Sequence, residues 1–231
     1  MAINRVNPSR VGIAILAKAP VPGFAKTRLQ PALSAATAAR IHRELTLRTL
    51  RTACNAGLGK LSLWCAPDPQ QRFFRAIARS KDFGPRVALQ RQVDGDLGQR
   101  MAAVFACANG PTLMIGTDCP TLSAEHLRQA ARALEDGDDA VFIPAEDGGY
   151  ALVGLRQSVP ELFAGIEWGS DQVLAQTRER MKQQGLRWGE LETLWDVDRP
   201  EDVVRWRARS FENAILPVGA GDTPSNPANF R

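Results

Sequence analysis

Three positively charged residues follow the first apolar stretch of the chain and have the chemistry to bind an anion. Residues 11–17 are apolar, and the loop after them contains Lys18, two prolines, Gly23, Lys26 and Arg28. Proline and glycine exclude a helix here and stiffen the loop. Lysine offers a point charge, whereas the arginine fork binds two phosphate oxygens. We predict that these cations bind a phosphate or nucleotide; a basic surface loop is the alternative.

The loop does not match the known glycine-rich phosphate loops. A P-loop requires G-x-x-x-x-G-K-[ST], but here two residues separate Gly23 from Lys26, and no glycine precedes Gly23 in the loop. The chain also has no G-x-G-x-x-G, so a dinucleotide-binding Rossmann site is not expected. Any phosphate site must therefore be of another kind.

A carboxylate follows a later apolar run. The stretch G-T-D-C-P-T-L places Asp118 just beyond a predicted buried strand, and Pro120 ends that strand. One carboxylate in such a place suits Mg²⁺, which keeps several waters and takes one or two carboxylates plus substrate phosphates. Capping of the turn is the alternative for Asp118. Cys119 lacks an obvious histidine partner, so we do not expect it to be a nucleophile.

Two further carboxylates lie near the C-terminal end, in W-D-V-D-R-P-E-D. In an extended segment Asp196 and Asp198 face the same side, because side chains alternate along a strand. Two carboxylates on one side repel each other unless a cation lies between them. We therefore predict that both ligate a metal; alternatively, Asp198 with Glu201 forms a capping box at the start of the last helix.

Two glycine-containing stretches are further candidates. In E-D-G-G-Y, Gly148 and Gly149 would let the backbone approach a bound acceptor beside Tyr150, or they simply form a hairpin turn. The stretch D-G-D-L-G-Q-R-M begins a predicted helix, and we assign Asp96 and Gly98 at its start to the base or ribose of a nucleotide.

His42 and His126 fall within predicted helices and are interpreted as structural.

Alternating strands and helices must position these residues. The predicted strands are residues 11–17, 60–66, 86–90, 111–118 and 139–145, and the predicted helices between them are 32–57, 69–80, 96–108 and 123–135. This alternation predicts an α/β fold with a mostly parallel sheet and helices on both faces. In open sheets of this kind, ligands bind at the carboxyl ends of the strands, which is where the candidate residues lie.

The second half completes the sheet. We predict a turn and strand over residues 146–155, a helix over 170–185, extended chain over 186–198 and a helix over 200–211. A single domain over residues 10–212 is expected, and the Pro-, Gly- and Asn-rich tail 213–231 is expected to be loosely ordered.

Composition narrows the function classes. The 231 residues carry a net charge of +4, without the interleaved basic and aromatic residues of nucleic-acid binders. No apolar run approaches the roughly 20 residues that span a bilayer, and the first residues lack the apolar core of a signal peptide. We therefore expect a cytoplasmic protein that binds neither nucleic acid nor membrane. Its four widely spaced cysteines predict neither disulfides nor a structural zinc site.

Six motifs in order resemble one family. They are K-A-P-V-P-G-F-A-K-T-R-L, G-D-L-G-Q-R-M, G-T-D-C-P-T-L, D-G-G-Y-A-L-V-G-L, E-W-G-S and D-V-D-R-P-E-D, between about Val11 and Trp206. The pattern resembles the bacterial CofC-like, GT-A-type transferases associated with radical-SAM and selenodomain proteins. That resemblance implies the nucleotide-diphospho-sugar transferase fold, which glycosyltransferases and nucleotidyltransferases share.

The resemblance also implies roles for single residues. An aspartate at the end of the central strand holds the metal in this superfamily and corresponds to Asp118; a second carboxylate corresponds to Asp196 or Asp198. The A-K-T-R-L element also occurs in 2-phospholactate guanylyltransferase, which implies a phosphate role for Lys26 and Arg28. Two departures stand out: the glycine-rich loop of sugar-nucleotide pyrophosphorylases is replaced by the proline loop, and the D-x-D of many glycosyltransferases is reduced to G-T-D.

The leading hypothesis is metal-dependent nucleotidyl transfer. A small phosphorylated or carboxylated acceptor would attack a nucleoside triphosphate and release pyrophosphate, with Mg²⁺ or Mn²⁺ as cofactor and with Lys26, Arg28 and Asp118 as the catalytic residues. A glycosyltransferase that uses a nucleoside-diphosphate sugar is the first alternative. A non-catalytic nucleotide-binding protein is the second.

Overall fold

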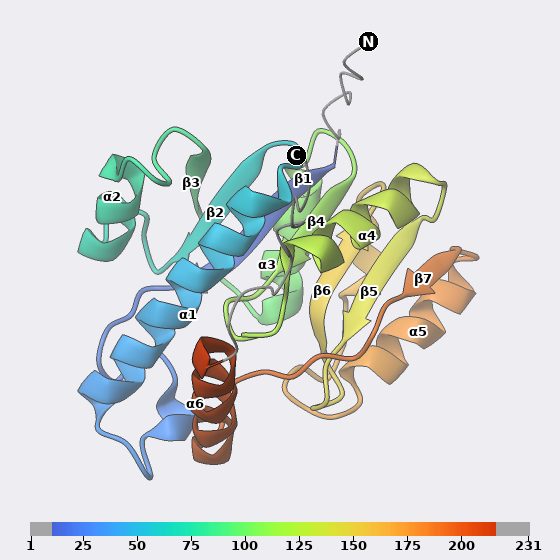
Figure 1. Ribbon diagram of the computed structural model, residues 1–231. Helices are drawn as coiled ribbons and strands as arrows, with labels where there is room; N and C mark the ends of the chain where they lie inside the picture. Colours follow the sequence, from blue (N-terminus) through green and yellow to red (C-terminus); the bar gives the residue numbers. More distant parts are fainter. Residues whose placement is uncertain (1–10, 216–231) are drawn as a thin grey trace, which may run out of the picture.

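A seven-stranded sheet forms the centre of the computed structural model, which describes residues 11–215 (Figure 1). The strand order is β3-β2-β1-β4-β6-β5-β7. Their bounds are β1 Gly12–Lys18, β2 Leu61–Ala66, β3 Val87–Arg91, β4 Thr112–Ile115, β5 Ala140–Pro144, β6 Tyr150–Leu155 and β7 Trp188–Glu190. Only β6 runs against its neighbours, β4 and β5. The predicted α/β fold with a mostly parallel sheet is confirmed.

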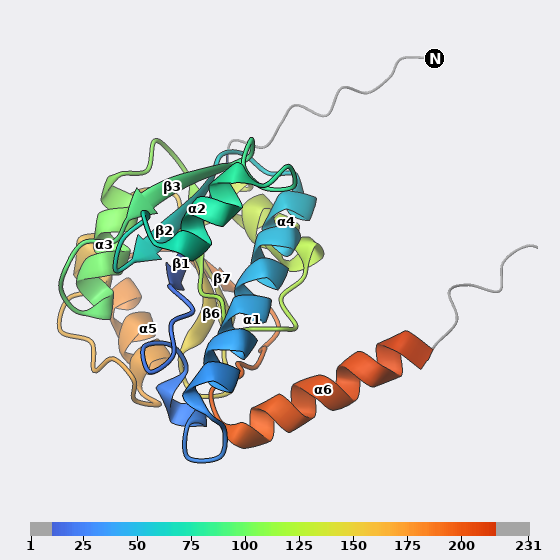
Figure 2. The ribbon, with the colours of Figure 1, turned by 90° about the vertical axis from the view of Figure 1, so that its left-hand side faces the viewer.

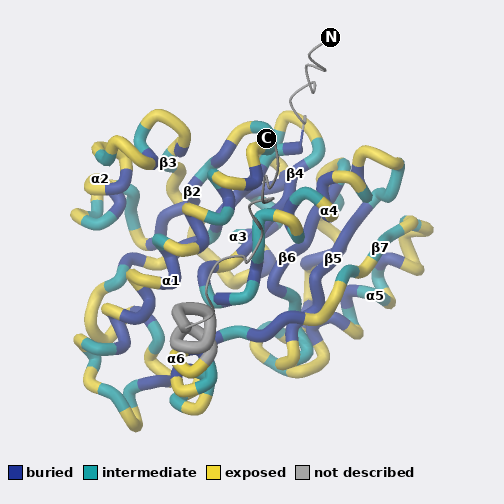
Figure 3. Tube along the Cα trace, in the orientation of Figure 1, coloured by how far each residue is buried: buried dark blue, intermediate teal, exposed yellow. Residues whose placement is uncertain are grey.

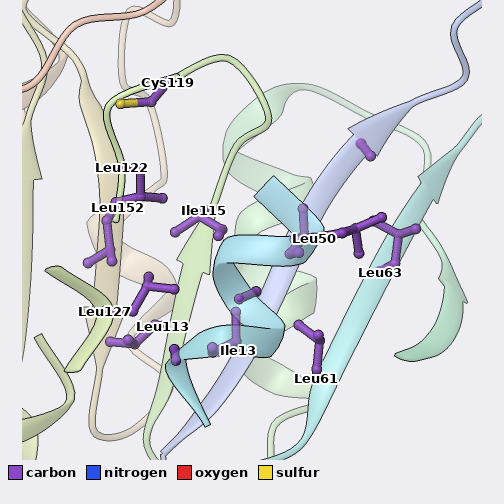
Figure 4. Close-up of a cluster of buried hydrophobic side chains, with 14 of the residues drawn as sticks. Ile13, Leu50, Leu61, Leu63, Leu113, Ile115, Cys119, Leu122, Leu127 and Leu152 are labelled. Atoms are coloured by element: carbon purple, nitrogen blue, oxygen red, sulfur yellow. The ribbon is translucent and has the colours of Figure 1, made fainter. Parts of the chain in front are cut away.

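Helices cover both faces of the sheet. The helices α1 (Ala35–Ala56), α2 (Arg72–Arg79) and α4 (Ala124–Glu135) pack on one face, and Figure 4 shows the apolar cluster that Leu50 of α1 and Leu127 of α4 form with the strands. The helices α3 (Leu97–Ala106) and α5 (Val173–Gln183) pack on the other face through a second apolar cluster. Because both faces are covered, β4 and β5 are buried along their whole length (Figure 3).

Local signals in the sequence explain where several helices begin and end. Ser34 caps α1, and its hydroxyl accepts a hydrogen bond from the Thr37 amide. Gly57 ends α1 with a positive φ of 65°, a conformation that favours glycine. Ser123 caps α4 and exchanges hydrogen bonds with His126 in a capping box. The predicted starts at Ser34 and Ser123 and the predicted stop at Gly57 are confirmed.

The C-terminal part differs in detail from the prediction. The predicted extended segment forms only the short strand β7 and one parallel bridge, between Ala145 and Leu194. The last helix, α6 (Pro200–Ile215), starts beside the N-terminal end of α1 (Figure 2), where Val203 and Ile41 share an apolar cluster. The predicted tail therefore begins within α6, and its residues 216–231 lie outside the described part of the chain. No helix within residues 11–215 is both long and apolar enough to cross a membrane.

The strand order creates a switch point between β1 and β4. From β1 the chain first adds β2 and β3 on one side and then places β4 on the other side. β1 and β4 are parallel and in register, with Ile15 opposite Ile115, so their carboxyl ends meet at one edge. In Figure 1 the segment that leads from β7 to α6 crosses this lower edge. A switch point of this kind is where open α/β sheets bind ligands.

Candidate functional site

A cavity of about 470 Å³ opens at the switch point. That volume suits a ligand of nucleotide or cofactor size. Its wall contains seven of the residues selected from the sequence: Lys18, Lys26, Arg28, Asp118, Tyr150, Asp196 and Asp198. The other four, Asp96, Gly98, Gly148 and Gly149, are not part of the wall.

Two distant chain segments bring the acidic groups together. Asp118 lies three residues beyond the end of β4, and its carbonyl accepts a hydrogen bond of 2.9 Å from the amide of Val197. The Val197 side chain is fully buried, whereas both flanking aspartates, Asp196 and Asp198, line the cavity. The two carboxylates thus share one side, as the alternation of an extended segment predicts.

Lys26 lies at the centre of this charge cluster. Its backbone has a positive φ of 53°, which is uncommon for a residue other than glycine. The side chain is only 4% exposed, and its ammonium lies 2.8 Å from Oδ1 of both Asp118 and Asp198. A third hydrogen bond runs to the carbonyl of Val197. An ammonium has three donors, so the protein itself accepts all of them.

Arg28 is arranged differently. Its side chain is 63% exposed, and a single guanidinium nitrogen lies 3.3 Å from Oδ2 of Asp198. The fork therefore has donors that can meet a ligand, and the exposed Lys18 also lines the cavity. In this arrangement a phosphate would meet Arg28 and Lys18 directly, whereas Lys26 would first have to release a carboxylate. The predicted phosphate role of Lys26 stays a prediction.

The carboxylates differ in their protonation. Burial disfavours the charged form of Asp118, but the ammonium of Lys26 outweighs this effect and lowers the pKa of Asp118. Burial likewise opposes the charge of Lys26, yet the two aspartates together raise its pKa. Burial, together with repulsion from neighbouring carboxylates, Asp118 foremost, raises the pKa of Asp196 to about 8. A further cation beside Asp196 would offset the repulsion from these carboxylates.

His42 is a member of the site that the sequence analysis interpreted as structural. It lies on the buried face of α1, and Nε2 donates to the Lys18 carbonyl at 2.9 Å, because a carbonyl only accepts. The Nδ1 atom lies 3.8 Å from Oδ1 of Asp118 and has no hydrogen-bond partner. Burial lowers the pKa of His42, which favours the neutral ring. The only sequence signal was a histidine among apolar residues of the helix that follows the cationic loop.

The glycines before β6 have packing roles. Gly148 has a φ of +86°, and a Cβ there would lie 2.1 Å from the carbonyl oxygen of Asp171. Its own carbonyl accepts from the amide of Leu174 at the start of α5. Gly149 donates to the side chain of Asp147. This is the hairpin turn that the sequence analysis kept as the alternative, and Tyr150 alone of the three predicted acceptor residues reaches the cavity.

The start of α3 meets the cavity through other residues than those predicted. Asp96 caps α3 in a capping box with Gln99. Gly98 is buried, and a Cβ there would lie 2.4 Å from the Phe163 carbonyl oxygen. The residues of α3 in the cavity wall are Leu97, Arg100 and Met101. The nucleotide roles assigned to Asp96 and Gly98 stay predictions that this geometry does not favour.

The hydrogen bonds settle the alternative for Asp198, and the pKa of Cys119 bears on the question of a nucleophile. Asp198 does not cap α6: its carboxylate accepts from Lys26 and Arg28, while Asp202 accepts from the Asp198 and Arg199 amides instead. The capping-box alternative for Asp198 is therefore wrong. Burial raises the pKa of the Cys119 thiol to about 11, so it is protonated at neutral pH and is not an activated nucleophile.

The cluster fits a metal that takes few protein ligands. Among the described residues, no group of three or more histidine, cysteine, aspartate or glutamate side chains is arranged to hold a metal ion by itself. Asp118 and Asp198 nevertheless share one cation already, the ammonium of Lys26. Mg²⁺ needs only one or two carboxylates when substrate phosphates supply further oxygens. The residues present are therefore compatible with a metal that binds together with a nucleotide.

Comparison with known proteins confirms the resemblance and the fold. The chain is 28% identical over 187 residues to the 3-phospho-D-glycerate guanylyltransferase of Phenylobacterium zucineum (strain HLK1), covering 78% of this chain and 83% of the relative. It is also similar to a crystal structure of a candidate nucleotide-diphospho-sugar transferase from Desulfovibrio desulfuricans G20, with a TM-score of 0.77, 28% identity and 92% of each chain covered.

A more distant structure shares the fold and binds a metal. It is a Mycobacterium tuberculosis H37Rv protein in complex with manganese, with a TM-score of 0.53 and 18% identity over 87% of this chain and 98% of that one. The fold of the present chain is that of the nucleotide-diphospho-sugar transferases. A family model described as "Uncharacterized protein conserved in bacteria (DUF2064)" matches residues 49–170, more than half of the chain. The chain belongs to this family.

Proposed function

We propose that the protein is a metal-dependent nucleotidyltransferase that transfers a nucleoside monophosphate, with guanosine triphosphate as the first candidate donor, to a small phosphorylated acid. The observation that carries the proposal is the convergence of Asp118, the Asp196–Asp198 segment and the cationic loop on one cavity at the switch point. The activity of the curated guanylyltransferase relative supports the choice of donor and acceptor.

The reaction demands little chemistry from side chains. An oxygen of the acceptor phosphate attacks the α-phosphorus of the triphosphate and forms the new phosphorus–oxygen bond. The bond from the α-phosphorus to the oxygen bridging to the β-phosphate breaks, and pyrophosphate leaves with that electron pair. The attacking oxygen is already an anion, so no general base is required. This agrees with a cavity in which Cys119 is protonated and His42 is held by the Lys18 carbonyl.

The protein's part is positioning and charge neutralisation. Arg28, with its exposed fork, and Lys18 would hold the phosphates that become the leaving group. Tyr150, in the wall of the same cavity, would border the acceptor. Asp118, with Asp196 or Asp198, would hold Mg²⁺ or Mn²⁺. When bound, such an ion offsets the negative charge that develops on the phosphate oxygens.

The proposal is tested by product formation. The protein is mixed with Mg²⁺, 3-phospho-D-glycerate and each of the four ribonucleoside triphosphates in turn, and pyrophosphate is assayed while the organic product is weighed by mass spectrometry. We expect pyrophosphate and a nucleotidylated acid in equal amounts, formed only with metal. Asp118→Asn is the matched control, because it keeps the shape of the side chain and removes its charge. Absence of pyrophosphate with every triphosphate and a panel of phosphorylated acids would refute the proposal.

Glycosyl transfer is the second candidate. The description of the Desulfovibrio structure as a nucleotide-diphospho-sugar transferase favours it. Thermal unfolding separates the two, because a ligand raises stability by about 2.7 kcal/mol at a hundredfold excess over its Kd. Stabilisation by a nucleoside-diphosphate sugar and not by any triphosphate would favour glycosyl transfer. Stabilisation by triphosphates without turnover of any acceptor would favour a non-catalytic nucleotide-binding protein.

A further inference from the structure

The ammonium of Lys26 lies between two carboxylates of the site. Its ammonium is 2.8 Å from one oxygen of Asp118 and 2.8 Å from one oxygen of Asp198, two residues that are 80 positions apart in the chain. The Val197 carbonyl takes the third donor. The Lys26 side chain is only 4% exposed, whereas the carboxylates of Asp118 and Asp198 are 41% and 34% exposed, so water screens these contacts only partly.

The backbone of the loop is shaped to keep the ammonium in this place. Lys26 is the one residue other than glycine within residues 11–215 that has a positive φ. Lysine rarely adopts this conformation, and such residues persist only where the surrounding structure determines them. Ala25 and Leu29 on either side of Lys26 are fully buried and anchor the turn. The ammonium is thus a fixed part of the acidic cluster and not a mobile surface charge.

Two cations cannot occupy the same space between two carboxylates. The oxygens that Lys26 holds belong to Asp118 and Asp198, which are also proposed metal ligands. A divalent ion that arrives alone must therefore compete with the ammonium. A bound nucleotide changes this competition. Its phosphate oxygens can accept hydrogen bonds from the Lys26 ammonium, which then releases the carboxylates for the divalent ion.

We propose that Lys26 is a built-in counter-ion, which holds Asp118 and Asp198 in the ligand-free protein and suppresses the binding of a divalent cation until a nucleotide is present. The inference rests on the proposed metal-dependent function, in which Asp118, with Asp196 or Asp198, holds the ion. It gives Lys26 a positioning role in the ligand-free protein, in addition to the phosphate contact predicted from the sequence. It also implies that metal and nucleotide each strengthen the binding of the other.

The experiment measures the affinity for Mn²⁺ alone, from the paramagnetic resonance signal of the free ion. Wild type is compared with Lys26→Met and with Arg28→Met. The two variants lose the same charge from the same loop and from the same acceptor, Asp198, but only Lys26 bridges the two carboxylates. We expect Lys26→Met to bind Mn²⁺ about tenfold or more tightly than wild type, because a buried ammonium that bridges both carboxylates competes better than an exposed guanidinium on one of them.

The control should behave differently. Arg28→Met is expected to stay within about twofold of wild type, because its pair with Asp198 is exposed. Lys26→Met that binds Mn²⁺ no tighter than wild type would overturn the inference, and so would an equal gain in Arg28→Met. Lys26→Gly provides a second variant if the methionine protein folds poorly, because glycine adopts the positive φ without strain.

A second arm separates this inference from the proposed function. Each protein is titrated again in the presence of a GTP analogue with a methylene group between the α- and β-phosphates. If wild type then binds Mn²⁺ but Lys26→Met shows no gain without the analogue, only the inference on Lys26 fails. If no protein binds Mn²⁺ even with the analogue, the metal-dependent function fails as well.

Discussion

Two turns at the same edge of the sheet contain glycine with positive φ, but one contributes to the cavity and the other to packing. Gly23 lies in the loop after β1, with a φ of +81° and open space around its missing side chain. Gly148 lies in the turn before β6, with a φ of +86° and the backbone of Asp171 against it. The first loop brings Lys26 and Arg28 into the cavity. The second turn packs against the start of α5, where the Leu174 amide donates a hydrogen bond to the Gly148 carbonyl.

The comparison shows that amino-acid composition alone does not distinguish a loop that binds a ligand from a turn that stabilises the fold. Both segments contain glycine and charged residues near a strand end. The difference comes from topology: the first loop leaves β1 at the switch point, while the second joins two antiparallel neighbours as a hairpin. Substitutions in the first loop should therefore alter ligand binding, and those in the second should alter stability.

The largest effect is expected at the carboxylate that the first loop faces. Asp118→Asn should lower the rate of pyrophosphate release by about 10²–10³-fold, because the charged group that we propose as a metal ligand is lost. The melting temperature, measured by calorimetry, should also fall, because the buried ammonium of Lys26 loses one of its two carboxylate partners. Full activity of this variant would mean that the chemistry lies elsewhere.

The two glycines provide a matched pair for stability. Gly148→Ala should reduce the free energy of unfolding by about 3 kcal/mol, because the new methyl group meets the Asp171 backbone as well as paying the cost of positive φ. Gly23→Ala should cost about 1 kcal/mol, since only the backbone conformation is strained. Urea denaturation of both variants measures the difference. Equal losses would show that the turn before β6 is no more tightly packed than the loop.

Arg28 tests whether the first loop contacts phosphate. Arg28→Lys should weaken nucleotide binding about tenfold, the equivalent of about 1.4 kcal/mol, because a fork becomes a point charge. Calorimetric titration with the GTP analogue gives the affinity. The charge is unchanged in this variant, so an unaltered affinity would exclude a forked phosphate contact at Arg28.

The smallest effect is expected at the start of α3. Asp96→Ala should cost about 1 kcal/mol of stability through the lost cap, with no change in nucleotide affinity of the folded protein. Asp96→Asn is the control, because asparagine also caps helices. A loss of affinity in both variants would instead support the nucleotide role that the sequence suggested for Asp96.

The sequence predicted the elements well because their signals are local. Apolar runs, the caps at Ser34 and Ser123 and the stop at Gly57 each act within a few residues. It also indicated which strand ends would meet, since that follows from the alternation of strands and helices.

Other features depend on contacts between distant parts of the chain. The three hydrogen bonds of Lys26 join residues more than 90 positions apart, and they follow from a positive φ that no local rule assigns to lysine. The packing of Gly148 against Asp171 and the approach of His42 to Asp118 are likewise tertiary. Such contacts decide which of several plausible residues enter the cavity.

The most direct test of the account is the position of a bound metal. Crystals grown with Mn²⁺ and the methylene analogue of GTP would be measured for anomalous scattering of manganese. We predict one strong peak in contact with Asp118, with Asp196 or Asp198, and with phosphate oxygens of the same nucleotide. A nucleotide bound outside the cavity at the switch point, or manganese that does not touch Asp118, would contradict the account.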